Sequence, residues 1–267
     1  MLAPKTLPLK PSPSEAWQDQ WDTLMENDQW LRRKLDRARR LREHYEYLNE
    51  NCPDLASCLP GIVVDIGPGD GVLLEIARAH GHTGVGIDAP DGAGGMGNPY
   101  LQASKLMHQR QNLTVFYERF ENWKPPEELL GKCVLANSRG SVEQVFSSYM
   151  KGKPHDQHHV AKELRWKQES DTEEALFRFV NKISELLREG GILLIHANGS
   201  ATQESDQWYS ETIIAQAAKC GLTLETSSHN LKHRFVKVNC DDSIEASESD
   251  SQSLSQEDRS PDQQSVE

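Results

Sequence analysis

Short apolar runs alternate with amphipathic stretches over residues 57–240. Such runs are typical of buried strands in a parallel sheet, and apolar positions three and four apart are typical of helices. Strands are predicted at 62–66, 85–87, 113–120, 132–137, 191–196, 222–226 and 235–240. Helices are predicted from Val72 to about Gly81, over 100–111, from Ser170 to Gly190 and over 205–220. This alternation predicts an α/β fold.

The first 56 residues follow a different pattern. Residues 1–13 contain four prolines and are expected to form a flexible arm. In residues 14–56 apolar positions recur at helical spacing, which predicts an N-terminal helical extension with one long helix along 31–48. Its other faces carry the basic residues Arg32, Arg33, Lys34, Arg37, Arg39, Arg40 and Arg42. They suit a solvated surface, or contact with an anionic substrate, RNA or the chain's own acidic segment.

Charge is concentrated at the other end of the chain. The net charge is −12, and residues 241–267, with nine acidic residues and one arginine, carry −8 of it. This composition predicts a disordered acidic tail. The five cysteines show no Cys-x-x-Cys spacing, which favours reduced thiols and a cytoplasmic location. With no apolar stretch long enough for a signal peptide or a membrane span, no membrane partner is expected.

The strongest chemical signal lies in residues 61–89, GIVVDIGPGDGVLLEIARAHGHTGVGIDA. It predicts a strand, a glycine turn, a helix and a second strand that ends on Asp88. An acid at that place can accept hydrogen bonds from a ribose diol, so the unit suits an adenosine-containing cofactor. A dinucleotide site requires G-x-G-x-x-G, but Val72 stands at its third glycine. Asp65 before the turn would repel a pyrophosphate and attract a cation.

The runs VVDIGPGDG and GVGIDA resemble the first two motifs of the class I S-adenosylmethionine-dependent methyltransferases. The resemblance implies S-adenosyl-L-methionine as cofactor, and a three-layer α-β-α sandwich with a seven-stranded, mostly parallel, Rossmann-like sheet and an antiparallel terminal strand. It also implies a set of cofactor-binding residues, with Phe120 and Glu121 near the adenine. The set is Asp65, Gly67, Pro68, Gly69, Gly71, Asp88, Ala89, Phe120, Glu121 and Asn137.

The methyl acceptor is left open by the sequence. The fourth strand ends in Asn137-Ser-Arg-Gly and lacks the Asn-Pro-Pro signature of amino-methylating DNA enzymes. An insertion at about 141–167 is expected to recognise the substrate. The candidate catalytic residues are Asn137, His155, His159 and His196, with Arg139 and Glu143 similarly placed. A small-molecule acceptor is the first hypothesis, RNA methylation through the basic extension the second, and a non-catalytic binding subunit the third; no metal site is expected.

Overall fold

The computed structural model describes residues 2–5, 7, 13–26, 28–90, 98–140, 169–197, 203–228 and 231–238. Residues 91–97, the insertion with His155 and His159, and the acidic tail therefore lie outside the described residues. The domain boundaries that depend on them remain predictions.

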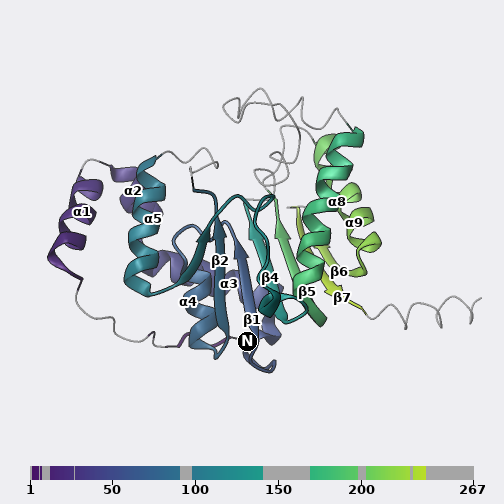
Figure 1. Cartoon of the computed structure of the whole chain (residues 1–267), viewed down its shortest axis with the longest axis horizontal. Coiled ribbons are helices and arrows are strands. Elements are labelled where there is room, and N and C mark those ends of the chain that lie inside the picture. The colour runs from purple at the N-terminus through teal and green to yellow at the C-terminus, as the bar shows by residue number, and fades with distance from the viewer. Residues whose placement is uncertain are drawn as a thin grey trace, which may run out of the picture.

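The strands form one seven-stranded sheet in the order β3-β2-β1-β4-β5-β7-β6 (Figure 1). The strands are β1 Ile62–Ile66, β2 Thr83–Asp88, β3 Thr114–Tyr117, β4 Cys133–Arg139, β5 Leu187–His196, β6 Leu222–Ser228 and β7 Lys232–Lys237. β1 to β5 pair in parallel, and β7 runs antiparallel between β5 and β6. The fold class that the resemblance implies is confirmed by this order and these directions.

Helices cover both faces of the sheet, because alternate strand residues point to opposite sides. Val63, Leu135 and Leu194 pack under α3 (Arg37–Asn51) and α4 (Val72–Ala79). Their chain neighbours pack in a second cluster under α8 (Glu169–Leu186) and α9 (Gln203–Lys219). The molecule is therefore a three-layer sandwich, with β1 and β4 at its centre (Figure 1).

The N-terminal extension forms three α-helices and a short 3-10 helix. They are α1 (Glu15–Glu26), α2 (Gln29–Lys34), α3 and η1 (Pro53–Ala56). The prediction of one long helix over 31–48 was wrong, because Asp36 begins a new one by accepting a hydrogen bond from the N–H of Arg39 (3.2 Å). Asp28 starts α2 in the same way, through the N–H of Leu31 (2.9 Å).

A third, smaller apolar cluster joins α1 and α2 to α5 (Asn98–Gln111). It contains Met25, Leu31 and Leu35 from the extension and Ala103 from α5. The indole N–H of Trp17 donates to the carbonyl of Leu106 (2.8 Å), which fastens α1 to α5. The extension is thus packed along the β3 side of the sheet as well as beneath β1 and β4.

Candidate functional site

The turn between β1 and α4 is built on three glycines with left-handed backbone conformation. Gly67, Gly69 and Gly71 have φ angles of 73°, 57° and 76°, which residues with a Cβ rarely adopt. The N–H of Gly71 donates to the carbonyl of Pro68 (2.9 Å) and closes the turn just before α4. A Cβ on Gly69 would lie 2.8 Å from the hydroxyl of Tyr100. The missing side chain therefore keeps space between the turn and α5.

Asp88 ends β2 beside this turn and is half-buried. Its Oδ1 accepts a hydrogen bond from the N–H of Ala89 (3.0 Å). Burial raises the pKa of Asp88 to about 6, and the bond to Ala89 and the charge of Lys105 oppose that rise. The ionised carboxylate can accept more hydrogen bonds than Ala89 supplies. A ligand hydroxyl placed there would stabilise the charged form.

Asp65 is held by Asn137, which is in turn held by Tyr47, and both come from distant parts of the chain. Nδ2 of Asn137, on β4, donates to Oδ1 of Asp65 (2.7 Å), and the hydroxyl of Tyr47, on α3, donates to Oδ1 of Asn137 (2.9 Å). All three residues are buried. Burial raises the pKa of Asp65 to about 7 although the bond from Asn137 lowers it. The oxygen and nitrogen of the Asn137 amide thus both bond to protein groups. Its role toward the acceptor or the cofactor remains a prediction.

The ring of Tyr47 also contacts two basic side chains at the ends of β4 and β5. The guanidinium carbon of Arg139 lies 4.8 Å from the centre of the Tyr47 ring, and the ring of His196 stacks on Tyr47 with centres 6.2 Å apart. Arg139 and His196 are partners in the register of β4 and β5. Burial, together with the charges of Arg139 and Lys232, lowers the pKa of His196 to about 4. His196 is therefore neutral at pH 7, and its proposed catalytic role is not tested.

These groups share one face of the sheet. Asp65 and Asn137 follow Val63 and Leu135 by two residues, and His196 follows Leu194 by two, so all three lie on the face that α3 and α4 cover. They also lie toward the carboxyl ends of their strands, where ligands of open α/β sheets bind. The edge is polarised: β2 and β1 contribute carboxylates, whereas β4 and β5 contribute a guanidinium and an imidazole.

Two ion pairs fasten α3 to α4 and the glycine turn. Nε of Arg40 donates to Oδ2 of Asp70 (2.8 Å), and the carboxylate of Asp70 also accepts the N–H of Val72 (3.3 Å). Arg37 forms a two-bond pair with Glu75 on α4. These partners could not be predicted, because nothing in a helical pattern shows which acid a basic residue meets.

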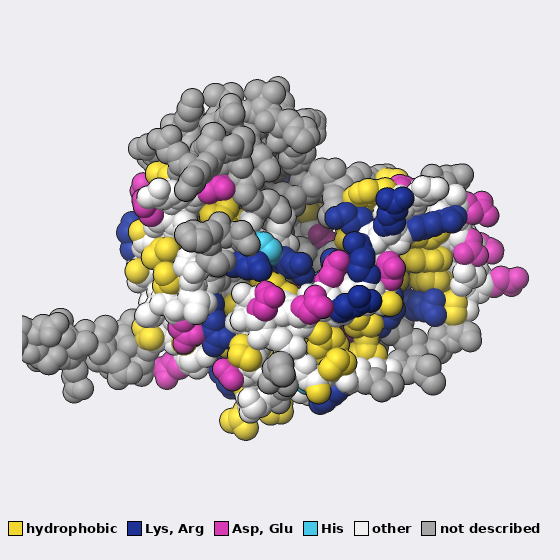
Figure 2. Space-filling view, turned by 180° about the vertical axis from the view of Figure 1, so that it is seen from behind, with side chains coloured by type: hydrophobic (Ala, Val, Ile, Leu, Met, Phe, Trp, Pro, Cys, Tyr) yellow, Lys and Arg dark blue, Asp and Glu magenta, His cyan; other side chains and the backbone are white. Residues whose placement is uncertain are grey.

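The basic surface of the extension is correspondingly smaller than its sequence indicates. Arg39 forms an ion pair with Glu43 at 3.5 Å, and Nε of Arg32 donates a hydrogen bond to the carbonyl of Met25. Figure 2, which views the molecule from behind, shows acidic side chains among the basic ones on this face. The solvated-surface alternative therefore fits part of the predicted basic face, and internal ion pairs account for Arg37 and Arg40.

The predicted adenine contacts lie in a packed turn after β3. The ring of Phe120 is 4% exposed and meets the ring of Phe179 edge-on with centres 5.4 Å apart. Nζ of Lys182, on α8, donates to the carbonyls of Phe120 (2.8 Å) and Glu121 (3.0 Å). These contacts give the Phe120 ring a place in the core. A cofactor contact of Phe120 or Glu121 remains a prediction.

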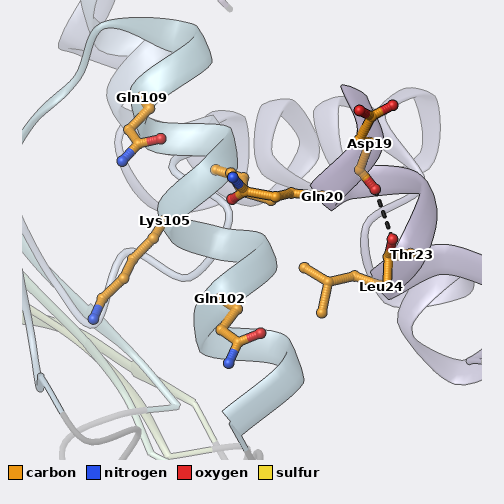
Figure 3. Close-up of a pocket in the computed structure, with 8 residues that line it drawn as sticks. Asp19, Gln20, Thr23, Leu24, Gln102, Lys105 and Gln109 are labelled. Atoms are coloured by element: carbon orange, nitrogen blue, oxygen red, sulfur yellow. Dashed lines mark hydrogen bonds between the residues drawn. The ribbon is translucent and has the colours of Figure 1, made fainter. Parts of the chain in front are cut away.

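The structure also has a groove between α1 and α5, with a volume of about 490 Å³ (Figure 3). Gln20 and Leu24 point from α1 toward α5, whereas Lys105 points away from α1 (Figure 3). None of its lining residues comes from the glycine turn or from the strand ends, so it is separate from the candidate site. The lining residues are Asp19, Gln20, Thr23, Leu24, Gln102, Lys105, Leu106 and Gln109.

The described part of the chain contains neither a membrane-spanning helix nor a metal-binding cluster. None of its helices has the length and apolar character of a membrane span. Within the same residues, no three His, Cys, Asp or Glu side chains are grouped so that they could hold a metal ion. The predicted candidates His155 and His159 lie outside the described ranges.

No protein-family model matches the chain, and none of the curated proteins is a significant match. Solved structures do align with it. A putative sarcosine dimethylglycine methyltransferase from Galdieria sulphuraria is 11% identical, covers 79% of this chain and 76% of its own, and has a TM-score of 0.43. A putative S-adenosylmethionine-dependent methyltransferase from Methanococcus maripaludis is 12% identical, with coverages of 87% and 98% and a TM-score of 0.42.

A third solved structure is a variant of a 16S rRNA adenine-N1 methyltransferase from Catenulisporales acidiphilia with its cosubstrate SAM. It is 15% identical, covers 70% of this chain and 90% of its own, and has a TM-score of 0.40. At these identities and TM-scores the three alignments support no argument about activity. The fold is assigned from the order and direction of the chain's own strands.

Proposed function

We propose that this chain is an S-adenosyl-L-methionine-dependent methyltransferase that acts on a small molecule. The observation that carries the proposal is the joint position of the glycine turn and two carboxylates. Asp65, one residue before the end of β1, and Asp88, the last residue of β2, lie on adjacent parallel strands beside a turn whose three glycines have positive φ. This arrangement offers the space, the hydrogen-bond acceptors and the negative charge that a sulfonium nucleoside needs.

Each residue would contribute a separate part of the cofactor site. Asp88 would accept hydrogen bonds from the ribose hydroxyls, since its half-buried carboxylate, whose pKa burial raises to about 6, ends β2 beside the glycine turn. Asp65, whose pKa burial raises to about 7, would supply negative charge on the sulfonium side, because a bound cation favours its ionised form, and Asn137 holds it in place. The same charge disfavours a pyrophosphate, which argues against a dinucleotide.

The chemistry of the cofactor makes few demands on the protein. In methyl transfer a lone pair of the acceptor forms a bond to the methyl carbon, and the electron pair of the S–C bond returns to sulfur. Positioning the acceptor in line with that bond provides most of the rate enhancement. We assign no general base, because that requirement depends on whether the acceptor must lose a proton.

The ion pairs of the extension favour a small molecule over RNA. Arg37 and Arg40 are neutralised by Glu75 and Asp70, so two of the basic residues that suggested RNA binding hold α3 in place instead. RNA binding depends strongly on unpaired basic residues, and it weakens steeply with salt. RNA methylation is therefore the alternative that the acceptor assay must exclude.

The cofactor assignment is tested by titrating S-adenosylhomocysteine into the wild type and Asp88→Ala in a calorimeter. Loss of two hydrogen bonds to a charged group should weaken binding about 100-fold, with the far-ultraviolet circular dichroism unchanged. Glu46→Gln removes an exposed carboxylate from α3 and serves as the charge-matched control, with wild-type affinity. Equal affinities for all three proteins would refute the role of Asp88.

The acceptor class is tested by incubating the protein and methyl-labelled cofactor with separate metabolite and RNA fractions of a cell extract. The proposal predicts label in the metabolite fraction. Label in RNA would show that RNA, and not a small molecule, is the acceptor. Tight cofactor binding without any transfer would favour a non-catalytic binding subunit.

A further inference from the structure

Arg139, a half-buried residue at the end of β4, forms no ion pair with a carboxylate of the described residues, although its charge helps to lower the pKa of Asp65. Among these residues Nη1 of Arg139 has no hydrogen-bond partner and is shielded from solvent, and the guanidinium contacts the face of the Tyr47 ring. A stacked but unpaired guanidinium keeps its fork of N–H donors free for a planar anion.

Two neighbouring cations, unlike Arg139, are paired with carboxylates. Arg40 is paired with Asp70, and Lys232 lies 3.5 Å from Glu50. His196, on the other strand of the pair, also has a buried ring nitrogen, Nδ1, without a hydrogen-bond partner. Two adjacent strand ends thus present unused hydrogen-bonding groups on one face of the sheet. Buried polar groups left unpaired are unfavourable, and a bound anion would provide them with a partner.

We propose that Arg139 and His196, seated around Tyr47, form a carboxylate-binding site at the ends of β4 and β5. The site rests on the proposed function and completes it, because it lies across β1 from Asp88 on the same edge of the sheet. The carboxylate belongs to one of two molecules that would meet there: the amino-acid part of the cofactor, or the methyl acceptor. Arg139 binds it through its fork, and His196 adds one hydrogen bond.

The test compares Arg139→Met with the wild type. Arg42→Met, which removes an exposed arginine of α3, is the matched control. Calorimetry measures the affinity for S-adenosylhomocysteine, which has a carboxylate, and for methylthioadenosine, which lacks one. Nuclear magnetic resonance follows the ring signals of His196 during titration with sodium acetate, against sodium chloride at the same ionic strength.

Two results support the site and name its ligand. A loss of ten-fold or more in affinity for S-adenosylhomocysteine, with methylthioadenosine unchanged, assigns the carboxylate to the cofactor. Unchanged affinity for both nucleosides, with a response of His196 to acetate that Arg139→Met abolishes, assigns it to the acceptor. If Arg139→Met does not fold, Arg139→Lys keeps the charge and loses the fork, and a smaller loss of the same pattern is expected.

The site is refuted if neither S-adenosylhomocysteine nor acetate binding depends on residue 139, or if both nucleosides lose affinity equally. These results differ from a failure of the proposed function. A wild type that binds neither nucleoside contradicts the methyltransferase assignment, and the acetate titration still decides whether Arg139 binds a carboxylate.

Discussion

The two halves of the strand edge are assembled in different ways. The acidic half comes from one continuous stretch, residues 61–89, in which turn and carboxylates are neighbours in sequence. The basic half joins Tyr47, Arg139 and His196, and the bond between Tyr47 and Asn137 spans 90 residues. The first half is assembled by local order along the backbone, and the second half by side chains that are far apart in the sequence. Each therefore responds to a different kind of substitution.

The largest effect is expected in the glycine turn. In Gly71→Ala the new Cβ would lie 2.4 Å from Cδ1 of Leu113 in a backbone with φ of 76°, so strain and overpacking should lower the free energy of unfolding by about 3 kcal/mol. Gly81→Ala has a similar φ of 89° with nothing within 4 Å of the Cβ, and should cost about 1 kcal/mol. Urea unfolding measures both. Equal losses would show that packing against Leu113 contributes nothing.

The next effect concerns the side-chain network. Asn137→Ala removes the donor to Asp65 and the acceptor for Tyr47, which should lower the free energy of unfolding by about 2 kcal/mol. Because the bond from Asn137 lowers the pKa of Asp65, its loss should raise that pKa above about 7. Carbon-detected resonance titration of the Asp65 carboxyl reads the shift. An unchanged pKa would mean that Asn137 does not bond to Asp65 in solution.

The same contrast explains how much of this site could be predicted from the sequence. The turn, Asp65 and Asp88 could be predicted, because local order alone brings them to one end of parallel strands. The partner of Asp65 could not, since nothing in the sequence shows that Asn137 donates to it or that Tyr47 bonds to Asn137. Arg37 and Arg40 appeared as surface charges, because sequence does not show that Glu75 and Asp70 lie beneath them.

The acidic half should also titrate. Binding that requires ionised Asp88, whose pKa is about 6, should weaken about ten-fold between pH 8 and pH 5. The raised pKa has the opposite effect on folding, because the folded protein binds the proton of Asp88 more tightly than the unfolded chain does. The stability that this proton contributes is present below the unfolded pKa and is lost as the pH rises through about 6. Calorimetry across this range checks the first effect, and affinity that rises toward pH 5 would contradict it.

The smallest effect is expected at the rim of the basic half. Lys232 lies 3.5 Å from Glu50, whose side chain is 64% exposed. Exposed pairs of this kind contribute little, so Lys232→Met should change the free energy of unfolding by less than about 0.5 kcal/mol. Thermal or urea unfolding tests this. A loss as large as that of Asn137→Ala would place Lys232 in the buried network.

The central claim is that the edge formed by Asp65, the glycine turn and Asp88 takes a sulfonium nucleoside. Parallel calorimetric titrations of the wild type with S-adenosylmethionine and with NAD test it most directly. Saturable binding of S-adenosylmethionine is expected, with NAD giving no heat beyond dilution. Saturable binding of NAD, with none of S-adenosylmethionine, would contradict it.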